Sequence, residues 1–245
     1  MAKTASPRPR PAAAAGRSPA AARRRPSRTS RVLTYVSGGS LAVLAVLVVV
    51  TLVAAGRSSE GPGQEVDPSV PVVAADSHYL SDAGPDAPVL VEFLDFECEA
   101  CAAVYPVVEQ IREEYEGRLS VVARYFPLPG HANAENAAVA VEAAAQQGEF
   151  ETMYQRMYET QEQWSHREES QAAVFRGFAD ELGLDLASYD EAVADPATLE
   201  RVLADRDDGL ALGVEGTPTF FLNGEKLEVT TTTEFVEQIE AALDE

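Results

Sequence analysis

Residues 89–101 of this chain read VLVEFLDFECEAC, an apolar run that leads directly into the two cysteines of the sequence. Such a run is typical of a buried strand, and the apolar spacing that follows the cysteines is typical of a helix. Cys98 is therefore expected at a helix N-terminus, where the helix dipole and free backbone N–H groups stabilise a thiolate. Cys101 lies about one helical turn further along, within reach of a disulfide with Cys98. The pattern predicts a redox-active dithiol, with Cys98 as the nucleophile and Cys101 as the buried resolving thiol.

Two other uses of the cysteine pair fit the residues less well. A zinc site ordinarily takes four nitrogen or sulfur ligands, but the chain adds only three separated histidines, His78, His131 and His166. A structural disulfide that closes so short a loop would remove little entropy from the unfolded chain. We therefore expect neither a metal nor a bound cofactor.

The net charge of −21 conceals two regions of opposite sign. Residues 1–31 carry nine of the 19 basic residues and no acidic residue, which leaves 10 basic and 40 acidic residues in the remainder. A strongly acidic domain repels the phosphates of nucleic acids and anionic lipids. No nucleic acid is therefore expected as a ligand of the main domain.

Residues 32–56 form an uncharged segment between Arg31 and Arg57. At about 1.5 Å per residue, a helix of this length crosses a hydrocarbon core of about 30 Å, so a single transmembrane helix is expected. The basic residues precede it, which predicts a cytoplasmic N-terminus and an exported remainder. A cleavable signal peptide is the alternative, because the most apolar part, 41–53, is short and small residues follow it. In both cases the cysteines lie outside the cytosol, where disulfides persist.

Composition divides the rest of the chain. Residues 1–31, rich in Pro, Ala, Ser and Arg, are expected to be a disordered basic tail, and the Gly/Pro/Ser-rich residues 57–76 a flexible linker. Residues 77–245 then form one exported domain. It begins with a β-β-α-β pattern, continues with a block of four helices over about 130–212, and ends with a hairpin and a helix. The hairpin is indicated by Asn223-Gly224 between two apolar stretches.

This domain resembles the DsbA-like branch of the thioredoxin-fold thiol–disulfide oxidoreductases. The resemblance rests on the C-x-x-C motif, on Pro106 five residues beyond it, on the stretch Gly216-Thr217-Pro218-Thr219-Phe220 before the hairpin, and on the helical block. It implies an α/β protein with a thioredoxin fold and an inserted helical subdomain, here preceded by a single transmembrane helix.

The resemblance also implies roles for residues away from the cysteines. It implies a cis Thr217–Pro218 bond, in a loop that leaves the Thr217 backbone free to pair with an extended substrate peptide. Glu92 matches a buried carboxylate that would accept a proton from Cys101, with an outward-facing strand residue as the alternative. His131 and Trp164 are expected to be a loop residue and a packing residue, respectively, without catalytic roles.

The predicted function is that of a membrane-tethered, extracytoplasmic oxidoreductase that forms disulfides in exported proteins. The family implies reoxidation by a membrane quinone-linked oxidase. The alternatives are a disulfide reductase or isomerase of the same fold, and a membrane-anchored peptide-binding or chaperone module with incidental cysteines. Glu99-Ala100, between the cysteines, differs from the Pro-His dipeptide of the strongly oxidising members of the family. Acidic residues surround Cys98 in the sequence, with Glu97 and Glu99 on either side and Glu92 and Asp95 just before. They predict a thiolate pKa nearer ~7 than ~3.5, and hence a milder oxidant.

Overall fold

The computed structural model describes residues 67–244, which all belong to the second of the two units of the chain, Pro62–Glu245. The predicted basic tail over 1–31, the predicted transmembrane helix over 32–56 and the first part of the predicted linker lie outside the described residues. Within 67–244, no helix combines the length and the apolar character needed to cross a membrane.

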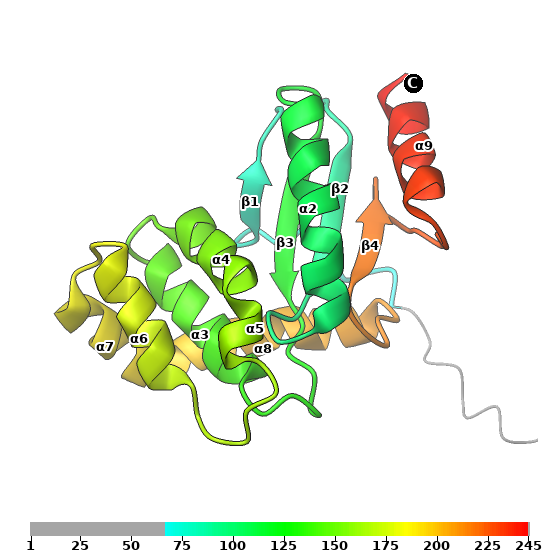
Figure 1. Ribbon diagram of the computed structural model, residues 1–245. Coiled ribbons are helices and arrows are strands. Elements are labelled where there is room, and N and C mark those ends of the chain that lie inside the picture. Colours follow the sequence, from blue (N-terminus) through cyan, green and yellow to red (C-terminus); the bar gives the residue numbers. More distant parts are fainter. Residues whose placement is uncertain (1–66, 245) are drawn as a thin grey trace, which may run out of the picture. The chain divides into compact units, whose positions relative to one another are not determined.

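The domain is built on a five-stranded sheet with the order β1-β3-β2-β4-β5. The strands are β1 (His78–Ser81), β2 (Val89–Leu94), β3 (Ser120–Tyr125), β4 (Thr219–Leu222) and β5 (Glu225–Lys226). Strands β2 and β3 are parallel, whereas β1 pairs with β3, β4 with β2 and β5 with β4 in antiparallel fashion. Helix α2 (Glu99–Glu114) makes the crossover between β2 and β3, so the expected parallel β-α-β unit is confirmed (Figure 1).

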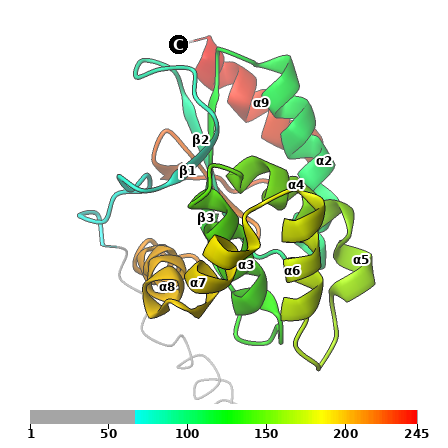
Figure 2. The same ribbon diagram turned by 90° about the vertical axis from the view of Figure 1, so that its left-hand side faces the viewer.

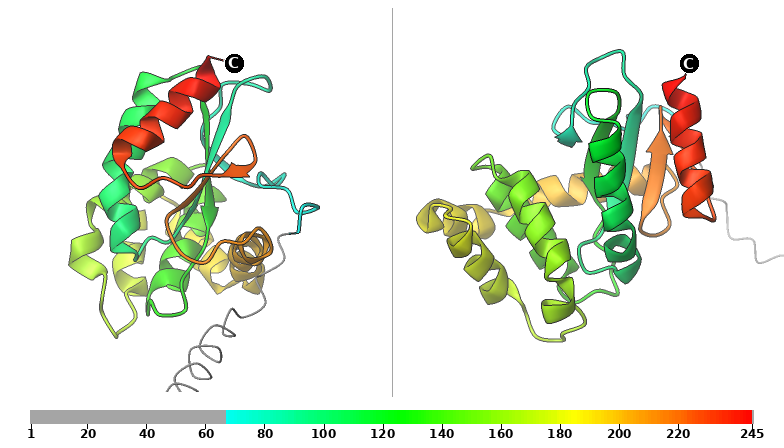
Figure 3. Two further views of the ribbon diagram at one scale, coloured as in Figure 1. Left: turned by 90° about the vertical axis from the view of Figure 1, so that its right-hand side faces the viewer. Right: turned by 45° about the horizontal axis from the view of Figure 1, so that its top comes forward.

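Both faces of the sheet are covered, and the residues of β2 alternate between them. Leu90 and Leu94 belong to a large apolar cluster with α2 and α9 (Thr232–Leu243), while Val91 and Phe93 belong to a smaller cluster on the opposite face. Helices α2 and α9 lie on one side of the strands and α8 (Pro196–Ala211) on the other (Figure 3). Because β2 is buried on both faces, its sequence is a nearly continuous run of apolar residues.

A helical subdomain is inserted between β3 and β4 and extends to one side of the sheet (Figures 1 and 2). It consists of α3 (Ala134–Ala145), α4 (Phe150–Glu159), α5 (Gln161–Trp164), α6 (Ala172–Glu181), α7 (Leu186–Ala194) and α8. The insertion is confirmed, but it contains more than the four helices expected. The short α5 and the helix α7 were not predicted. The start of α7 has a recognisable signal, because the Asp185 side chain accepts a hydrogen bond from the Ser188 N–H at 2.7 Å.

The hairpin forms where it was predicted, but its second strand is shorter than the apolar stretch suggested. Asn223 and Gly224 have positive φ values of 51° and 85°, as a tight two-residue turn requires. Strand β5 comprises only Glu225–Lys226, and the Leu227 N–H donates to the Phe220 carbonyl at 2.9 Å. Beyond that bond the chain leaves the sheet edge toward α9.

The second part of the predicted linker, 67–76, packs against the domain and is not a free tether. The Asp67 N–H donates to the last residue of α8, the Ala211 carbonyl, at 2.8 Å. The Arg124 guanidinium donates to the Pro71 carbonyl at 3.1 Å. Apolar residues of the segment cover the smaller cluster, namely Val70, Val72 and Val73. These valines explain the difference, because a free linker would leave their apolar surface in water.

Helix α8 approaches the sheet closely at a glycine, which gives a test of this packing. A Cβ at Gly209 would lie 2.8 Å from Phe126 Cδ2 and 3.0 Å from Phe93 Cδ1. Gly209→Ala should therefore lower the free energy of unfolding by about 1–2 kcal/mol, although alanine favours helix over glycine by about 1 kcal/mol. Gly177→Ala, in α6 with open space around the Cβ, is the matched control and should be neutral or stabilising. Equal effects of the two variants in urea unfolding would contradict this packing.

Candidate active site

The two cysteines lie at the start of α2, which follows β2 after a short turn. Cys98 is the N-cap residue, with extended backbone angles of φ −72° and ψ 123°, and Cys101 lies in the first turn. Both are free thiols, and their exposed fractions are 6% for Cys98 and 0% for Cys101. The predicted strand-to-helix placement is thus observed, and Cys98 is the more accessible of the two.

The two thiols have opposite electrostatic environments. A hydrogen bond from the Cys101 thiol lowers the pKa of Cys98 to about 5; burial opposes this shift, while the Thr217 side chain and the N–H groups of Cys101 and Ala100 support it. Burial raises the pKa of Cys101 well above its ordinary value, reinforced by Cys98 and by the Glu92 charge. One thiol is therefore prepared to be a thiolate near neutral pH, whereas its neighbour is held protonated.

The Cys98 pKa of about 5 lies above ~3.5, as expected, but below the expected value near ~7, because the hydrogen bond from the Cys101 thiol lowers it most. Two of the acidic residues expected to oppose this shift, Asp95 and Glu97, are turned into the protein. Glu97 is 1% exposed, and its carboxylate accepts hydrogen bonds from the N–H groups of Asn133 at 2.6 Å and His166 at 3.0 Å. Only Glu99 is exposed, where it pairs with His166 at 3.0 Å. The buried carboxylates hold the surrounding loops in place, and their hydrogen-bond donors offset their charge.

Asp95 organises the turn between β2 and α2. Its carboxylate accepts hydrogen bonds from the N–H groups of Glu97 at 2.8 Å and Leu128 at 2.9 Å, and it lies 2.7 Å from Nδ1 of His131. Burial opposes protonation of His131, but the hydrogen bond to Asp95 and nearby negative charges, including Cys98, outweigh it and raise the His131 pKa. His131 is therefore a loop residue, as expected, but one that pairs with Asp95 beside the active-site turn.

A second contact fixes the active-site turn from the helical subdomain. The Gln161 side chain amide donates to the carbonyls of Phe96 at 2.8 Å and Cys98 at 2.9 Å. Gln161 begins the short helix α5, which was not predicted, so this residue was missed. Trp164 at the end of α5 is fully buried against Phe175, which confirms it as a packing residue.

The Thr217–Pro218 bond is cis, as the resemblance implied. The Cys98 thiol donates to the Thr217 carbonyl, with Sγ 3.4 Å from the oxygen, so the loop lies directly against the cysteine pair. Beside it lies a groove of about 380 Å³, lined by residues 215–220 and 226–229. Proline has no N–H to occupy this side of the loop, which leaves room for another backbone to approach.

Glu92 lies beneath the cysteine pair and is not the outward-facing residue of the alternative. Its side chain is 1% exposed, on the same face of β2 as Leu90 and Leu94. Burial, together with the charges of Cys98 and Glu109, raises the pKa of Glu92 to about 8. At neutral pH this carboxyl group therefore carries a proton, and it electrostatically raises the pKa of Cys101 when it is charged.

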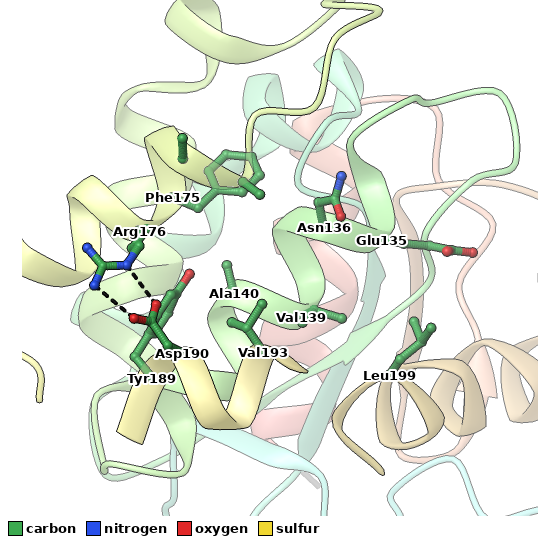
Figure 4. A pocket seen from close by; sticks show the side chains of 12 residues that line it. Glu135, Asn136, Val139, Ala140, Phe175, Arg176, Tyr189, Asp190, Val193 and Leu199 are labelled. Carbon is green, nitrogen blue, oxygen red and sulfur yellow. Dashed lines mark hydrogen bonds and ion pairs between the residues drawn. The ribbon is translucent and has the colours of Figure 1, made fainter. Parts of the chain in front are cut away.

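Other parts of the described domain do not add a second reactive centre. Residues 67–244 hold no group of three or more His, Cys, Asp or Glu side chains arranged to bind a metal ion. A pocket of about 360 Å³ lies in the helical subdomain, between α3, α6, α7 and α8 (Figure 4). Its walls are largely apolar, and an ion pair between Arg176 and Asp190 lies at one side, with Nε 2.7 Å from Oδ1. Its lining includes neither cysteine and no residue of the cis-proline loop.

A family model described as thioredoxin matches residues 84–244, which is well over half of the chain. The chain belongs to the thioredoxin family. Its C-x-x-C pair at a helix start, the cis-proline loop and the inserted helices make it a DsbA-like member, with the fold and the cysteine pair of a thiol–disulfide oxidoreductase.

Solved structures support the DsbA-like fold. The chain superimposes on alpha-DsbA1 from Wolbachia pipientis with a TM-score of 0.60 and 19% identity, covering 70% of this chain and 93% of that one. The superposition on oxidised BdbD from Bacillus subtilis has a TM-score of 0.59 and 19% identity, and it covers 69% of this chain and 94% of that one. The superposition on MdbA, a thiol-disulfide oxidoreductase from Corynebacterium diphtheriae, has a TM-score of 0.52 and 20% identity, and it covers 66% of this chain and 89% of that one.

The curated relatives with higher sequence identity are named as Na(+)/H(+) antiporters. The chain is 36% identical over 146 residues to the Na(+)/H(+) antiporter NhaA 1 of Mycolicibacterium gilvum, covering 58% of this chain and 23% of that protein. It is 37% identical over 164 residues to the Na(+)/H(+) antiporter NhaA 3 of Salinispora tropica, which covers 66% of this chain and 24% of that protein. The chain thus spans about a quarter of the length of these curated relatives.

The low thiolate pKa gives a direct test of the site. Absorbance at 240 nm in the reduced protein should rise with a midpoint near pH 5, because folding lowers the Cys98 pKa from 9.0 to about 5. The stability that the thiolate contributes is fully present above pH 9.0 and is lost as the pH falls through about 5. The reduced form should therefore lose stability relative to the oxidised form in that range.

The control for this titration is Cys98→Ser, which should remove the transition near pH 5, since the pKa of Cys101 is raised. A midpoint of ~7 in the unmodified protein would instead restore the original expectation that flanking carboxylates dominate the thiolate.

Proposed function

We propose that this chain is an extracytoplasmic thiol–disulfide oxidoreductase that introduces disulfides into exported proteins. The observation that carries the proposal is the asymmetry of the cysteine pair. Cys98 has a pKa lowered to about 5 beside the cis-proline loop, while the neighbouring Cys101 is buried with a raised pKa. A dithiol whose outer sulfur is stabilised as a thiolate has a stabilised reduced form, and its disulfide is therefore a good oxidant.

The reaction begins with the oxidised pair. A substrate thiolate attacks Sγ of Cys98, forming a mixed disulfide and releasing Cys101 as the leaving sulfur. The high pKa of Cys101 requires that this sulfur take a proton, which protonated Glu92 supplies. A second substrate thiolate then attacks the substrate sulfur of the mixed disulfide and releases Cys98 as a thiolate. The substrate loses two electrons and gains a disulfide, and the pair Cys98 and Cys101 is reduced.

The cis-proline loop is the proposed place for the substrate backbone. Thr217 precedes the cis bond, and its carbonyl already lies 3.4 Å from Cys98 Sγ. An extended peptide that pairs with the Thr217 backbone would bring its own cysteine to Cys98. The groove of about 380 Å³ beside this loop gives room for the adjoining substrate residues.

Location and redox partner are part of the proposal. The basic residues before the uncharged segment 32–56 support a single-pass anchor with the catalytic domain outside the cytoplasm. Reoxidation would then fall to a membrane quinone-linked oxidase. Protease added to intact spheroplasts should digest the domain, whereas protection until the cells are lysed would exclude this topology.

The test of the direction of reaction is the equilibrium potential of the Cys98/Cys101 pair in glutathione buffer. DsbA lies at about −120 mV and thioredoxin at about −270 mV. An oxidant with a thiolate pKa of about 5 should lie above about −200 mV. A potential below about −200 mV would indicate that the chain is a disulfide reductase.

Two other functions are less well supported. A peptide-binding or chaperone module with incidental cysteines would show no exchange with reduced peptides, before or after Cys98→Ser. It does not account for the opposed pKa shifts of the two thiols. Ion transport is not proposed for this chain, because the match covers only 23–24% of each antiporter.

A further inference from the structure

Among the buried polar atoms of the described residues that lack a hydrogen-bond partner, three lie in or face the large apolar cluster that contains Cys101. They are Oε2 of Glu92 and the hydroxyl oxygens of Tyr154 and Tyr158. The residues are 1%, 0% and 6% exposed, respectively. A buried polar group left unpaired costs about 1–3 kcal/mol, and such groups in proteins generally bind another residue or an ordered water.

These atoms belong to one region of the core. Glu92 alternates along β2 with Val91 and Phe93, so its side chain faces the larger cluster, which contains Cys101 and both tyrosines. The rings of Tyr154 and Tyr158, from α4, have centroids 5.2 Å apart. Burial raises the pKa of each tyrosine well above its ordinary value, and the charge of Glu92 adds to both shifts.

The same region reaches the surface through Tyr105 of α2. Its ring stacks on Tyr158 with a centroid distance of 5.1 Å and meets Tyr154 edge-on at 5.7 Å. Tyr105 is partly exposed and lines a groove of about 890 Å³ together with Glu109. The tyrosines therefore lie between a buried carboxyl group and an open, acidic groove.

We propose that Tyr154 and Tyr158 bind internal water and, with it, form the path along which Glu92 exchanges its proton with the groove at Tyr105 and Glu109. This inference rests on the proposed function, in which Glu92 donates a proton to Cys101. A roomy polar site with two to four partners is where buried water is found. Glu92 Oε2 and the two tyrosine hydroxyls supply three such partners on one side of the sheet.

The proton balance of the reaction requires such a path. When Cys101 leaves as a thiolate, Glu92 gives it one proton and becomes a buried carboxylate. With a pKa of about 8, that carboxylate takes one proton from solvent at neutral pH. When the pair is reoxidised, Glu92 first returns a proton to solvent and can then accept the proton of Cys101. A tyrosine hydroxyl passes a proton by accepting one and donating its own. The raised pKa values of both tyrosines keep the hydroxyls protonated, so no tyrosinate forms.

Other groups that affect the charge of this region lie on α2 and the preceding turn. Those that face Glu92 and the two tyrosines are Asp95, Cys98, Cys101, Tyr105, Glu109 and Arg112. None of them is altered by removing a tyrosine hydroxyl. A change in pH dependence after such a removal therefore reports on the path.

The test compares Tyr154→Phe, Tyr158→Phe and the double variant with the unmodified full-length chain. We expect the oxidised double variant to react with reduced glutathione at least about tenfold more slowly at neutral pH, with an altered pH profile between pH 5 and 9 and an altered solvent isotope effect in D₂O. The Cys98 titration near pH 5 should be unchanged, because the rings and the helix start are preserved.

Two controls separate a proton path from a structural effect. Tyr189→Phe removes the hydroxyl of another buried tyrosine, in α7, and should leave the rate, pH profile and isotope effect unchanged. In a Glu92→Gln background, Tyr158→Phe should cause no further loss, because the group that the path serves is gone. Wild-type pH profiles and isotope effects in both tyrosine variants would overturn the proposal. Absence of exchange in the unmodified chain would instead overturn the proposed function.

Discussion

Cys101→Ser should accumulate mixed disulfides with exported proteins in cells, whereas Cys98→Ser should accumulate none and should lose thiol exchange entirely. In the first variant Cys98 retains its position at the helix start, its Thr217 contact and its accessibility. The Cys98 thiolate can still attack a substrate disulfide, which breaks that bond and forms a mixed disulfide. The Cys101 thiol, which could attack Cys98 Sγ and release the substrate again, is absent. In the second variant the remaining Cys101 is fully buried, with a raised pKa that keeps it in the unreactive thiol form.

The measurement is non-reducing electrophoresis after alkylation, with the full-length chain expressed in a bacterial host. The double variant Cys98→Ser/Cys101→Ser serves as the background, since the chain has no other cysteine. Trapping of equal strength by the two single variants would mean that the roles of the sulfurs are assigned wrongly. Cys101→Ser should also raise the pKa of Cys98, because the hydrogen bond from the Cys101 thiol contributes most to the lowered value.

Features that depend on neighbours in the sequence could be predicted. The strand-to-helix placement of Cys98 follows from a continuous apolar run and a helical spacing, and the hairpin follows from Asn223-Gly224. The cis bond before Pro218 came from the family resemblance, because an X-Pro bond alone is cis only about 5–6% of the time.

Features that depend on distant partners could not be predicted. The face of β2 on which Glu92 lies was undecided, since both faces of this strand are buried and no polar alternation marks them. The direction of Glu97 depends on Asn133 and His166, which lie 36 and 69 residues away. Gln161 is 63 residues from the Cys98 carbonyl that it binds. Nothing in the local sequence of the C-x-x-C motif indicates these contacts.

Arg124→Met should lower the free energy of unfolding by about 3 kcal/mol or more, which is the largest stability effect expected in the domain. Arg124 is 1% exposed, and its Nε donates to Asp205 at 2.8 Å while a terminal nitrogen pairs with Asp208 at 2.5 Å. Its removal leaves the fully buried Asp205 carboxylate with less compensation, and breaking a buried pair from one side typically costs about 3–5 kcal/mol. A terminal nitrogen of Arg201 also lies 2.9 Å from Oδ2 of Asp205, and this second ion pair should keep the loss of stability near about 3 kcal/mol.

The matched control is Arg176→Met, which breaks the exposed pair with Asp190 in the helical subdomain. That pair has good geometry, with contacts of 2.7 and 2.8 Å, but both side chains are about half exposed. Exposed pairs contribute about 0–1 kcal/mol, so urea unfolding should separate the two variants clearly. Similar losses would mean that Asp205 is compensated in another way. Because Asp205 holds α8 against β3 and α8 leads into the loop before Pro218, Arg124→Met should also weaken the seating of that loop on Cys98.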